Sequence, residues 1–220
     1  MTEKPARRRD FVMGILHIRK LKHSAGGREI LNIDALSVDS GGRLLLLGPS
    51  GCGKTTLLSL MAGLMRAQNG DVTFDSTNYA ALSSAALDGL RRRSFGFVFQ
   101  KLHLLGHLSL LENVRLASDK PDDAFIRALL ARLGLEGKEK QAAHVLSHGE
   151  AQRAAIARAL AGKPRVLFAD EPTSALDDAH TAAVARLLLD ETARSGAALV
   201  VATHDARLKP YFDAAWEMAA

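Results

Sequence analysis

The stretch Leu44-Leu-Leu-Leu-Gly-Pro-Ser-Gly-Cys-Gly-Lys-Thr-Thr56 decides the fold of this chain. The run from Leu44 to Leu47 is continuously apolar, as in a parallel-sheet strand that is covered on both faces. The residues from Thr55 to Met65 are helix-like, so a glycine-rich loop joins a buried strand to a helix. The loop matches the pattern G-x-x-x-x-G-K-[ST], which a chain of this length contains by chance with a probability of about 1%. In this context the pattern predicts a phosphate-binding loop.

The residue types of this loop suit an anionic phosphate. Glycines allow successive backbone N–H groups to surround a β-phosphate at the positive N-terminus of a helix. Lys54 adds a mobile charge for the β- and γ-phosphates, and the hydroxyl of Thr55 can ligate Mg²⁺. The alternative interpretation is a flexible glycine turn, and Cys52 is interpreted as a tolerated small residue rather than a redox switch. The predicted binding residues of the loop are Gly48, Pro49, Ser50, Gly51, Cys52, Gly53, Lys54, Thr55 and Thr56.

A second apolar strand ends in two adjacent carboxylates, Asp170 and Glu171, after the residues from Val166 to Ala169. Ligands gather at the carboxyl ends of parallel strands, and burial of two carboxylates without counter-charges would be costly. We therefore expect Asp170 to ligate Mg²⁺. We expect Glu171, turned the other way by the alternation of the strand, to orient or deprotonate the water that attacks a γ-phosphate.

Length and composition restrict the class of protein. The 220 residues, 47% of them hydrophobic, fit one domain with a substantial core rather than two domains. No apolar run approaches the ~20 residues that a membrane-spanning helix needs. A single cysteine excludes a disulfide framework and suits a reducing cytosol. The net charge of +5 suits anionic ligands or a membrane surface without demanding nucleic acid.

The pattern along the chain predicts one interrupted domain. Residues 1–10 are interpreted as a disordered basic tail and residues 11–220 as a single domain. Its core comprises residues 11–100 and 162–220, and a helical insert of about residues 101–161 interrupts it because Leu, Ala, Glu and Arg recur there at helical spacing. Apolar runs and turn signals place strands at residues 11–22, 30–38, 44–47, 72–74, 95–99, 166–169 and 197–202.

Further motifs in the expected order make the chain resemble the ATP-binding cassette family over roughly residues 14–212. Leu146-Ser-His-Gly-Glu-Ala-Gln-Arg153 is similar to the signature motif of that family, and Ala169-Asp-Glu-Pro-Thr-Ser-Ala-Leu-Asp177 to its second nucleotide motif and D-loop. Gln100 and His204 follow predicted strands where the family has its Q-loop glutamine and its switch histidine. The middle of the chain also resembles the lipoprotein-releasing and macrolide-efflux cassettes.

The resemblance implies the fold class α/β: a P-loop NTPase core with a mostly parallel sheet, an N-terminal antiparallel β region and an inserted α-helical subdomain. Lys54, Glu171 and His204 would be catalytic. Ser147, as the N-cap of a helix from Glu150 to Ala161, would present the positive end of that helix to a γ-phosphate bound by the opposite subunit.

The remaining implied roles concern the nucleotide and the dimer. Gly149 would permit close approach of the backbone. Gln100 would contact Mg²⁺ or the water, together with the metal ligands Thr55 and Asp170, and Asp177 would support communication across the dimer. His23 is the best-placed residue for stacking on adenine. Two departures from the family pattern are His148 in place of glycine and Glu150 in place of glutamine.

The implied function is an ATP-binding and ATP-hydrolysing subunit, with ATP and Mg²⁺ as cofactors, that forms a homodimer around two nucleotides. It would drive a separate transmembrane permease from the cytoplasmic side of the inner membrane, as a peripheral protein, in export or in lipoprotein, lipid or drug extrusion. The alternative is a cassette ATPase that regulates a cell-envelope complex without transport. Nucleic acid is not an expected partner, because the long coiled coil of the repair members and the tandem cassettes of the translation members are missing from the sequence. A simple P-loop kinase would not need the signature motif.

Two further features are open to interpretation. His103 and His107 are four residues apart and could share a helix face in a zinc site, but no further ligand is apparent. The residues from Leu102 to Leu111 are leucine-rich, so they either pack the helical insert or form an apolar docking patch for a permease helix.

Overall fold

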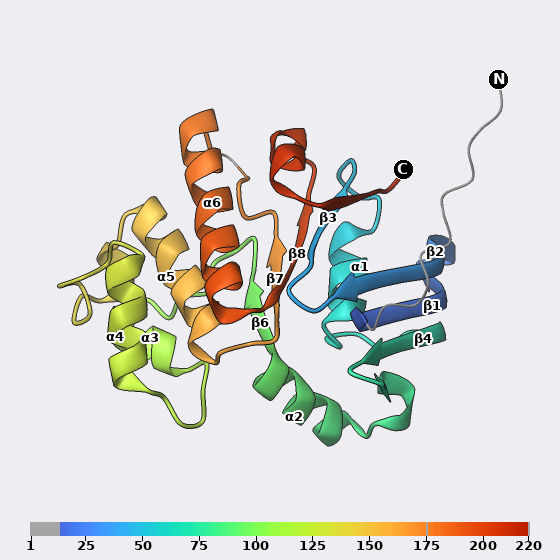
Figure 1. The fold of residues 1–220 in the computed structure, drawn as a ribbon, viewed down its shortest axis with the longest axis horizontal. Helices are drawn as coiled ribbons and strands as arrows, with labels where there is room; N and C mark the ends of the chain where they lie inside the picture. The colour runs from blue at the N-terminus through green and yellow to red at the C-terminus, as the bar shows by residue number, and fades with distance from the viewer. Residues whose placement is uncertain (1–13, 175, 220) are drawn as a thin grey trace.

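The computed structural model describes residues 14–174 and 176–219, which form two β-sheets with helices packed around them (Figure 1). The predicted basic tail, residues 1–10, lies outside the described residues. Among the described residues, none of the helices is both long enough and apolar enough to cross a membrane.

A parallel sheet forms the centre of the fold. Its hydrogen-bonded strand order is β6-β7-β8-β3-β9, and every neighbouring pair is parallel. The strands are β3 (Arg43–Leu47), β6 (Phe95–Val98), β7 (Val166–Asp170), β8 (Ala198–Thr203) and β9 (Ala214–Glu217). Parallel strands place their carboxyl ends at one edge, so the residues that follow β3, β7 and β8 meet there.

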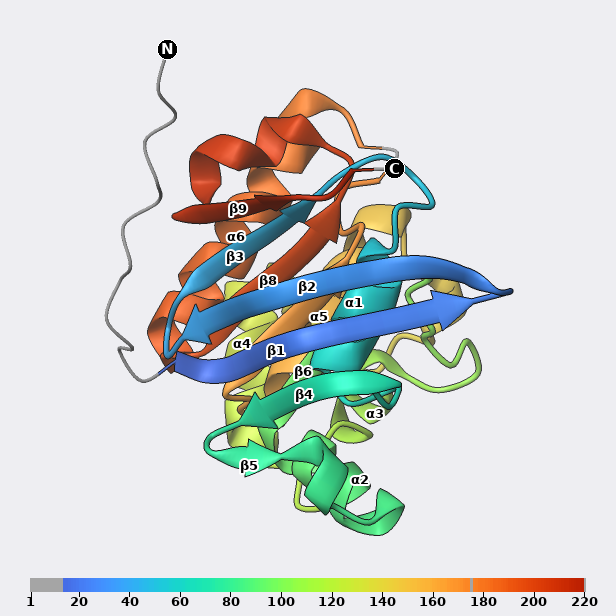
Figure 2. The same cartoon turned by 90° about the vertical axis from the view of Figure 1, so that its right-hand side faces the viewer.

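An antiparallel sheet packs beside it, in the order β2-β1-β4-β5. Figure 2 shows β1, β2 and β4 crossing in front of α1, which lies between this sheet and the parallel one. The strands are β1 (Gly14–Ala25), β2 (Arg28–Asp39), β4 (Asn69–Phe74) and β5 (Thr77–Asn78). Buried and exposed residues largely alternate in β2, as in a sheet with one face on the core.

The helices lie on both faces of the parallel sheet. In Figure 1, α1 lies on one side of this sheet and α3, α4, α5 and α6 lie on the other. The α-helices are α1 (Lys54–Met61), α2 (Ser84–Ser94), α3 (Leu110–Arg115), α4 (Asp123–Arg132), α5 (His148–Ala161) and α6 (Asp178–Ser195). Short 3₁₀ helices occur at η1 (Tyr79–Ala81), η2 (Ala143–Val145) and η3 (Ala206–Tyr211).

The parallel sheet separates two apolar clusters, because successive side chains of a strand point to opposite faces. Leu45 and Leu167 pack in one cluster with α3, α4, α5 and α6. Leu46 and Phe168 pack in the other with α1 and the antiparallel sheet. Both faces are covered, which is why the sequences of these strands are continuously apolar.

The structure confirms the predicted fold class, with strand ends that differ by one to a few residues. The signature helix α5 begins at His148, two residues earlier than predicted, with Ser147 as its N-cap. Strand β9 was not predicted. His103 and His107 lie in the irregular segment between β6 and α3, so they do not share a helix face.

Candidate active site

The glycine-rich loop lies between β3 and α1 as predicted, and two of its glycines need their backbone freedom. Gly51 and Gly53 have φ angles of 84° and 95°, a region that residues with a side chain rarely adopt. A Cβ on Gly48 would lie 2.5 Å from the backbone oxygen of Met218, because the residues after β9 pass close to the loop. The loop is therefore shaped by local backbone geometry and by a distant segment.

Lys54 lies inside the curve of this loop. Its Nζ donates hydrogen bonds of 2.9 Å to the carbonyl oxygens of Gly48 and Pro49. The same Nζ lies 3.7 Å from Oε1 of Glu171, and the lysine is only 6% exposed. The ammonium group is thus held where loop carbonyls and a catalytic candidate converge.

Thr55 and Asp170 form the predicted pair of oxygen ligands. The Thr55 hydroxyl donates to Oδ2 of Asp170 at 2.9 Å, although 115 residues separate them in sequence. Burial raises the pKa of Asp170 above its ordinary value, and neighbouring Glu171 adds to the rise, whereas the Thr55 hydrogen bond and Lys54 oppose it. A hydroxyl and a buried carboxylate are hard oxygen donors of the kind that Mg²⁺ prefers.

Glu171 is turned by its backbone rather than by simple strand alternation. Its φ of +48° is in the left-handed region, and β7 ends one residue earlier. Thr203 donates to Oε2 of Glu171 at 2.8 Å, and Nδ1 of His204 lies 3.0 Å from both carboxylate oxygens. The predicted pair of carboxylate and histidine is therefore in direct contact.

No side-chain hydrogen bond joins Gln100 or His23 to the residues described above. Gln100 is exposed and follows β6. His23, in β1, is only 5% exposed and its Nδ1 has no hydrogen-bond partner. Its strand pairs with β2, whose Ile30 and Leu31 lie against Gly53 of the phosphate loop. His23 thus lies near the loop, with its ring covered by protein.

The signature segment begins α5 with a complete capping box. The Ser147 side chain accepts from the Glu150 backbone N–H, and Oε2 of Glu150 accepts from the Ser147 backbone N–H at 2.8 Å. Lys138, in the loop after α4, forms an ion pair with the other carboxylate oxygen of Glu150. The side chain of Arg153 lies beside Gly149, and its Nη1 is 3.5 Å from the position that a Cβ on Gly149 would occupy. Helix α5 packs on α3, α4 and β6, whereas α1 packs on β7 and β8.

The structure adds partners that the sequence did not reveal. Asp177 is the N-cap of α6, and both the backbone N–H and Nδ1 of His180 contact its carboxylate. Those contacts lower the pKa of Asp177. The buried Gln152 of α5 donates to the carbonyl of Pro172, which follows Asp170 and Glu171. Residue type alone gave no signal for this link, because its two ends are 20 residues apart and meet only through packing.

Comparisons with known proteins show the family to which the chain belongs. A profile of the family described as ABC transporter matches residues 31–174. The lipoprotein-releasing system ATP-binding protein LolD of Syntrophotalea carbinolica is 40% identical over 217 residues, covering 96% of this chain and 91% of that protein. An uncharacterised ABC transporter ATP-binding protein of Mycobacterium tuberculosis is 42% identical over 216 residues, 94% of this chain, and the chain spans 65% of its length.

A solved structure has the same fold. The ATP-binding cassette MJ0796, in a dimeric post-hydrolysis state bound to ADP and Pi, superposes with a TM-score of 0.81 at 29% identity and covers 92% of this chain and 94% of its own. The phosphate loop, the paired carboxylates and the capped signature helix all lie within residues 31–174, which the family profile matches. The chain belongs to the ABC transporter family, as an ATP-binding and ATP-hydrolysing member.

Proposed function

We propose that this chain drives a separate transmembrane permease, at the cytoplasmic side of the inner membrane, in export or extrusion of a lipoprotein, lipid or drug. The observation that carries the proposal is the convergence of Lys54, Glu171 and His204 beside the phosphate loop. The 40% identity to a lipoprotein-releasing relative supports the outward direction and a lipid-like cargo.

ATP binding in this proposal uses the loop and its lysine. The backbone N–H groups of the loop from Gly48 to Thr56, except at Pro49, which has none, surround the β-phosphate at the positive end of α1. Lys54 exchanges its two loop carbonyls for the β- and γ-phosphate oxygens. His23 is the candidate for contact with adenine, and that contact requires its ring to leave its present buried position.

The donors present fit a magnesium ion. Thr55 and Asp170 would hold it, with Gln100 as a further ligand, and the charge of the ion would offset the cost of keeping Asp170 ionised in a buried position. Bound there, the ion would neutralise part of the phosphate charge.

Hydrolysis would use Glu171 as the base for the attacking water. Thr203 and His204 fix the orientation of its carboxylate through hydrogen bonds of 2.8 and 3.0 Å. The ammonium group of Lys54 lies 3.7 Å from Oε1 of Glu171, so a positive charge stands next to the proposed base.

A complete site would need two chains. The signature end of α5 belongs to the helical layer on one face of the parallel sheet, whereas α1, which follows the phosphate loop, packs on the other face (Figure 1). We infer a head-to-tail homodimer in which Ser147 and Gly149 of one subunit approach the γ-phosphate held by the other. Asp177 would transmit the closure between subunits.

The permease would dock on the apolar surface next to the leucine-rich segment. Leu105 and Leu116 are 43% and 60% exposed. They line a surface pocket of about 360 Å³ together with Arg92, Phe97 and His103. Exposed leucines beside an arginine favour a helix with apolar and acidic side chains as the occupant.

Substitution of Glu171 tests the proposed mechanism. Glu171→Gln is expected to retain ATP binding, to lower hydrolysis by at least about 100-fold, and to accumulate an ATP-dependent dimer, because only the base is lost. Lys54→Ala is expected to weaken nucleotide binding itself. The measurements are phosphate release, nucleotide affinity and sedimentation with ATP, with the exposed Glu136→Gln as control. Unchanged hydrolysis in Glu171→Gln would contradict the assignment of the base.

Gentle purification from membranes tests the proposed partner. Co-purification of a membrane permease supports transport, and Leu105→Asp should then release it. Recovery with a cell-wall hydrolase regulator in place of a transporter would favour the regulatory alternative and contradict the transport proposal.

A further inference from the structure

The positive end of α5 carries a negative charge in this chain. Glu150 is the third residue of the helix, and its carboxylate accepts the Ser147 backbone N–H at 2.8 Å. A carboxylate at this position stabilises an isolated helix. The same charge repels any anion that approaches the helix end, and the proposed dimer requires a γ-phosphate to do so.

Lys138 neutralises this carboxylate. Its ammonium group pairs with Oε1 of Glu150, the oxygen that the helix end does not use. The two side chains are 33% and 18% exposed, so solvent screens the pair only in part. The loop that carries Lys138 is itself fixed, because the Lys138 N–H donates to Leu135 and its carbonyl accepts from Gln141.

Protonation does not remove the charge of Glu150. The hydrogen bond from Lys138 has the largest effect, and together with the hydrogen bonds from Ser147 it lowers the pKa of Glu150 to about 2. The carboxylate is therefore ionised at physiological pH, and a nearby cation has to compensate it. Arg153, beside Gly149, adds a further positive charge at this helix end.

We propose that Lys138 is a positioning residue for the signature motif: by holding and neutralising Glu150, it keeps the start of α5 able to bind the γ-phosphate of the opposite subunit. The proposal rests on the proposed ATP dimer. It assigns Lys138 a role in dimer closure and none in the binding of nucleotide to its own phosphate loop, because α1, which follows that loop, packs on the opposite face of the parallel sheet from α5.

The test uses the full chain with Glu171→Gln, so that hydrolysis does not consume the ATP dimer. Adding Lys138→Met should weaken ATP-dependent dimerisation by roughly ten-fold, because an uncompensated carboxylate then faces the phosphate. ATP affinity of the single chain should stay unchanged. Lys138→Arg should dimerise like its parent, since it keeps the charge.

Removal of the carboxylate provides the decisive control. Glutamine also closes a capping box, so Glu150→Gln keeps the helix end intact while removing its charge. With Glu150→Gln present, Lys138→Met should no longer weaken the dimer. Sedimentation velocity at several protein concentrations measures the dimer dissociation constant, and circular dichroism verifies folding of each variant.

The possible outcomes separate this proposal from the one on which it rests. If Glu171→Gln alone stays monomeric with saturating ATP, the dimer itself is contradicted. If Glu171→Gln dimerises and Lys138→Met has no effect, the role of Lys138 is overturned. An equal loss with and without Glu150→Gln would assign Lys138 a purely structural role and would also overturn the proposal. Suppression of the loss by Glu150→Gln supports it.

Discussion

Asp170 is a buried carboxylate whose charge its neighbours offset only in part. Burial and the adjacent Glu171 raise its pKa, and the Thr55 hydroxyl and Lys54 lower it by less. In the unfolded chain the group titrates near 3.8, the ordinary pKa of an aspartate. Between 3.8 and the raised folded value, the folded state binds more protons than the unfolded state, so this group lowers stability progressively as the pH rises through that window.

The nucleotide-free protein should therefore become more stable when this charge is removed. Asp170→Asn keeps an oxygen that accepts from Thr55, and it should raise the free energy of unfolding at pH 7 by about 1 kcal/mol. The gain should shrink as the pH falls toward 3.8, where the wild-type carboxyl is neutral as well. Urea unfolding at pH 7 and at pH 4.5 measures both values.

The same substitution should nearly abolish activity, because it removes the charge of the proposed magnesium ligand. A loss of about 100-fold in ATP hydrolysis is expected. Increased stability combined with lost activity would identify Asp170 as a residue kept for function. A lower stability of Asp170→Asn at pH 7 would contradict the electrostatic argument.

Single residues of the site were largely predictable from sequence, because each lies at the end of a local pattern. Thr55 follows the glycine loop, and His204 follows an apolar strand. The direction of Glu171 was argued from strand alternation, whereas the structure turns it through a φ of +48°. Backbone conformation just beyond a strand depends on its surroundings, which the residue types do not encode.

At the scale of elements, the contact between α5 and β6 depends on a glycine. A Cβ on Gly96 would lie 2.1 Å from the backbone oxygen of Ala159, so any larger residue would push the signature helix away from the sheet. Gly96 has no positive φ, which makes close packing the reason for glycine at this position.

Gly96→Ala should accordingly destabilise the protein by about 1–3 kcal/mol through overpacking. Gly106→Ala is the matched control, since its Cβ would lie 3.4 Å from the Cβ of His144 and needs little adjustment. Its effect should stay within about 0.5 kcal/mol. Urea unfolding midpoints compare the two variants, and equal effects would refute the packing argument.

Elements with strong periodicity were predicted, and those that depend on distant partners were not. The runs of β3, β7 and β8 are apolar because both of their faces are buried, and α5 is marked by its capping residues. The sequence of β9 is short and mixed, and the strand exists because β3 provides a parallel partner. Residues 103–107 have helical spacing but form a loop.

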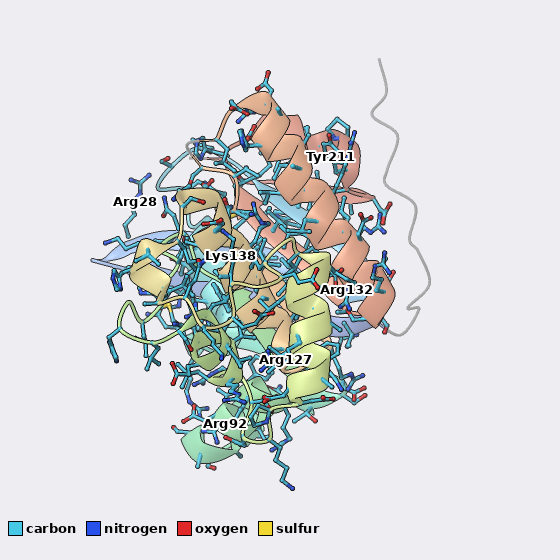
Figure 3. The ribbon with its side chains drawn as sticks, turned by 90° about the vertical axis from the view of Figure 1, so that its left-hand side faces the viewer. Arg28, Arg92, Arg127, Arg132, Lys138 and Tyr211 are labelled. Atoms are coloured by element: carbon cyan, nitrogen blue, oxygen red, sulfur yellow. The ribbon has the colours of Figure 1, made fainter. Side chains whose placement is uncertain are left out.

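At the scale of the molecule, an ion pair joins the inserted helices to the core. Arg132 of α4 donates to both carboxylate oxygens of Glu191 in α6, at distances of 3.0 to 3.3 Å. The Glu191 side chain is 7% exposed and the Arg132 side chain 34%. Arg132 is labelled in Figure 3 where α4 faces α6. Removal of the arginine leaves a buried carboxylate with one weaker partner, Arg194 at 3.7 Å.

Arg132→Ala should lower the free energy of unfolding by about 2 kcal/mol, because a buried charge loses its paired hydrogen bonds. Arg127→Ala on the same helix is the matched control, since Arg127 is exposed to solvent. Thermal unfolding in low and moderate salt measures both. An Arg132→Ala variant as stable as the control would show that packing alone holds the helical layer.

The position of Cys52 has a practical consequence. It is the single cysteine of the sequence, and its side chain lies buried in the phosphate loop, next to Gly48. A maleimide can therefore modify only one thiol per chain, that of Cys52. Because this thiol is buried, the reagent reaches it only when the loop opens. The rate at which Cys52 is modified therefore reports the opening of the phosphate loop in the unaltered chain. Bound nucleotide should lower that rate.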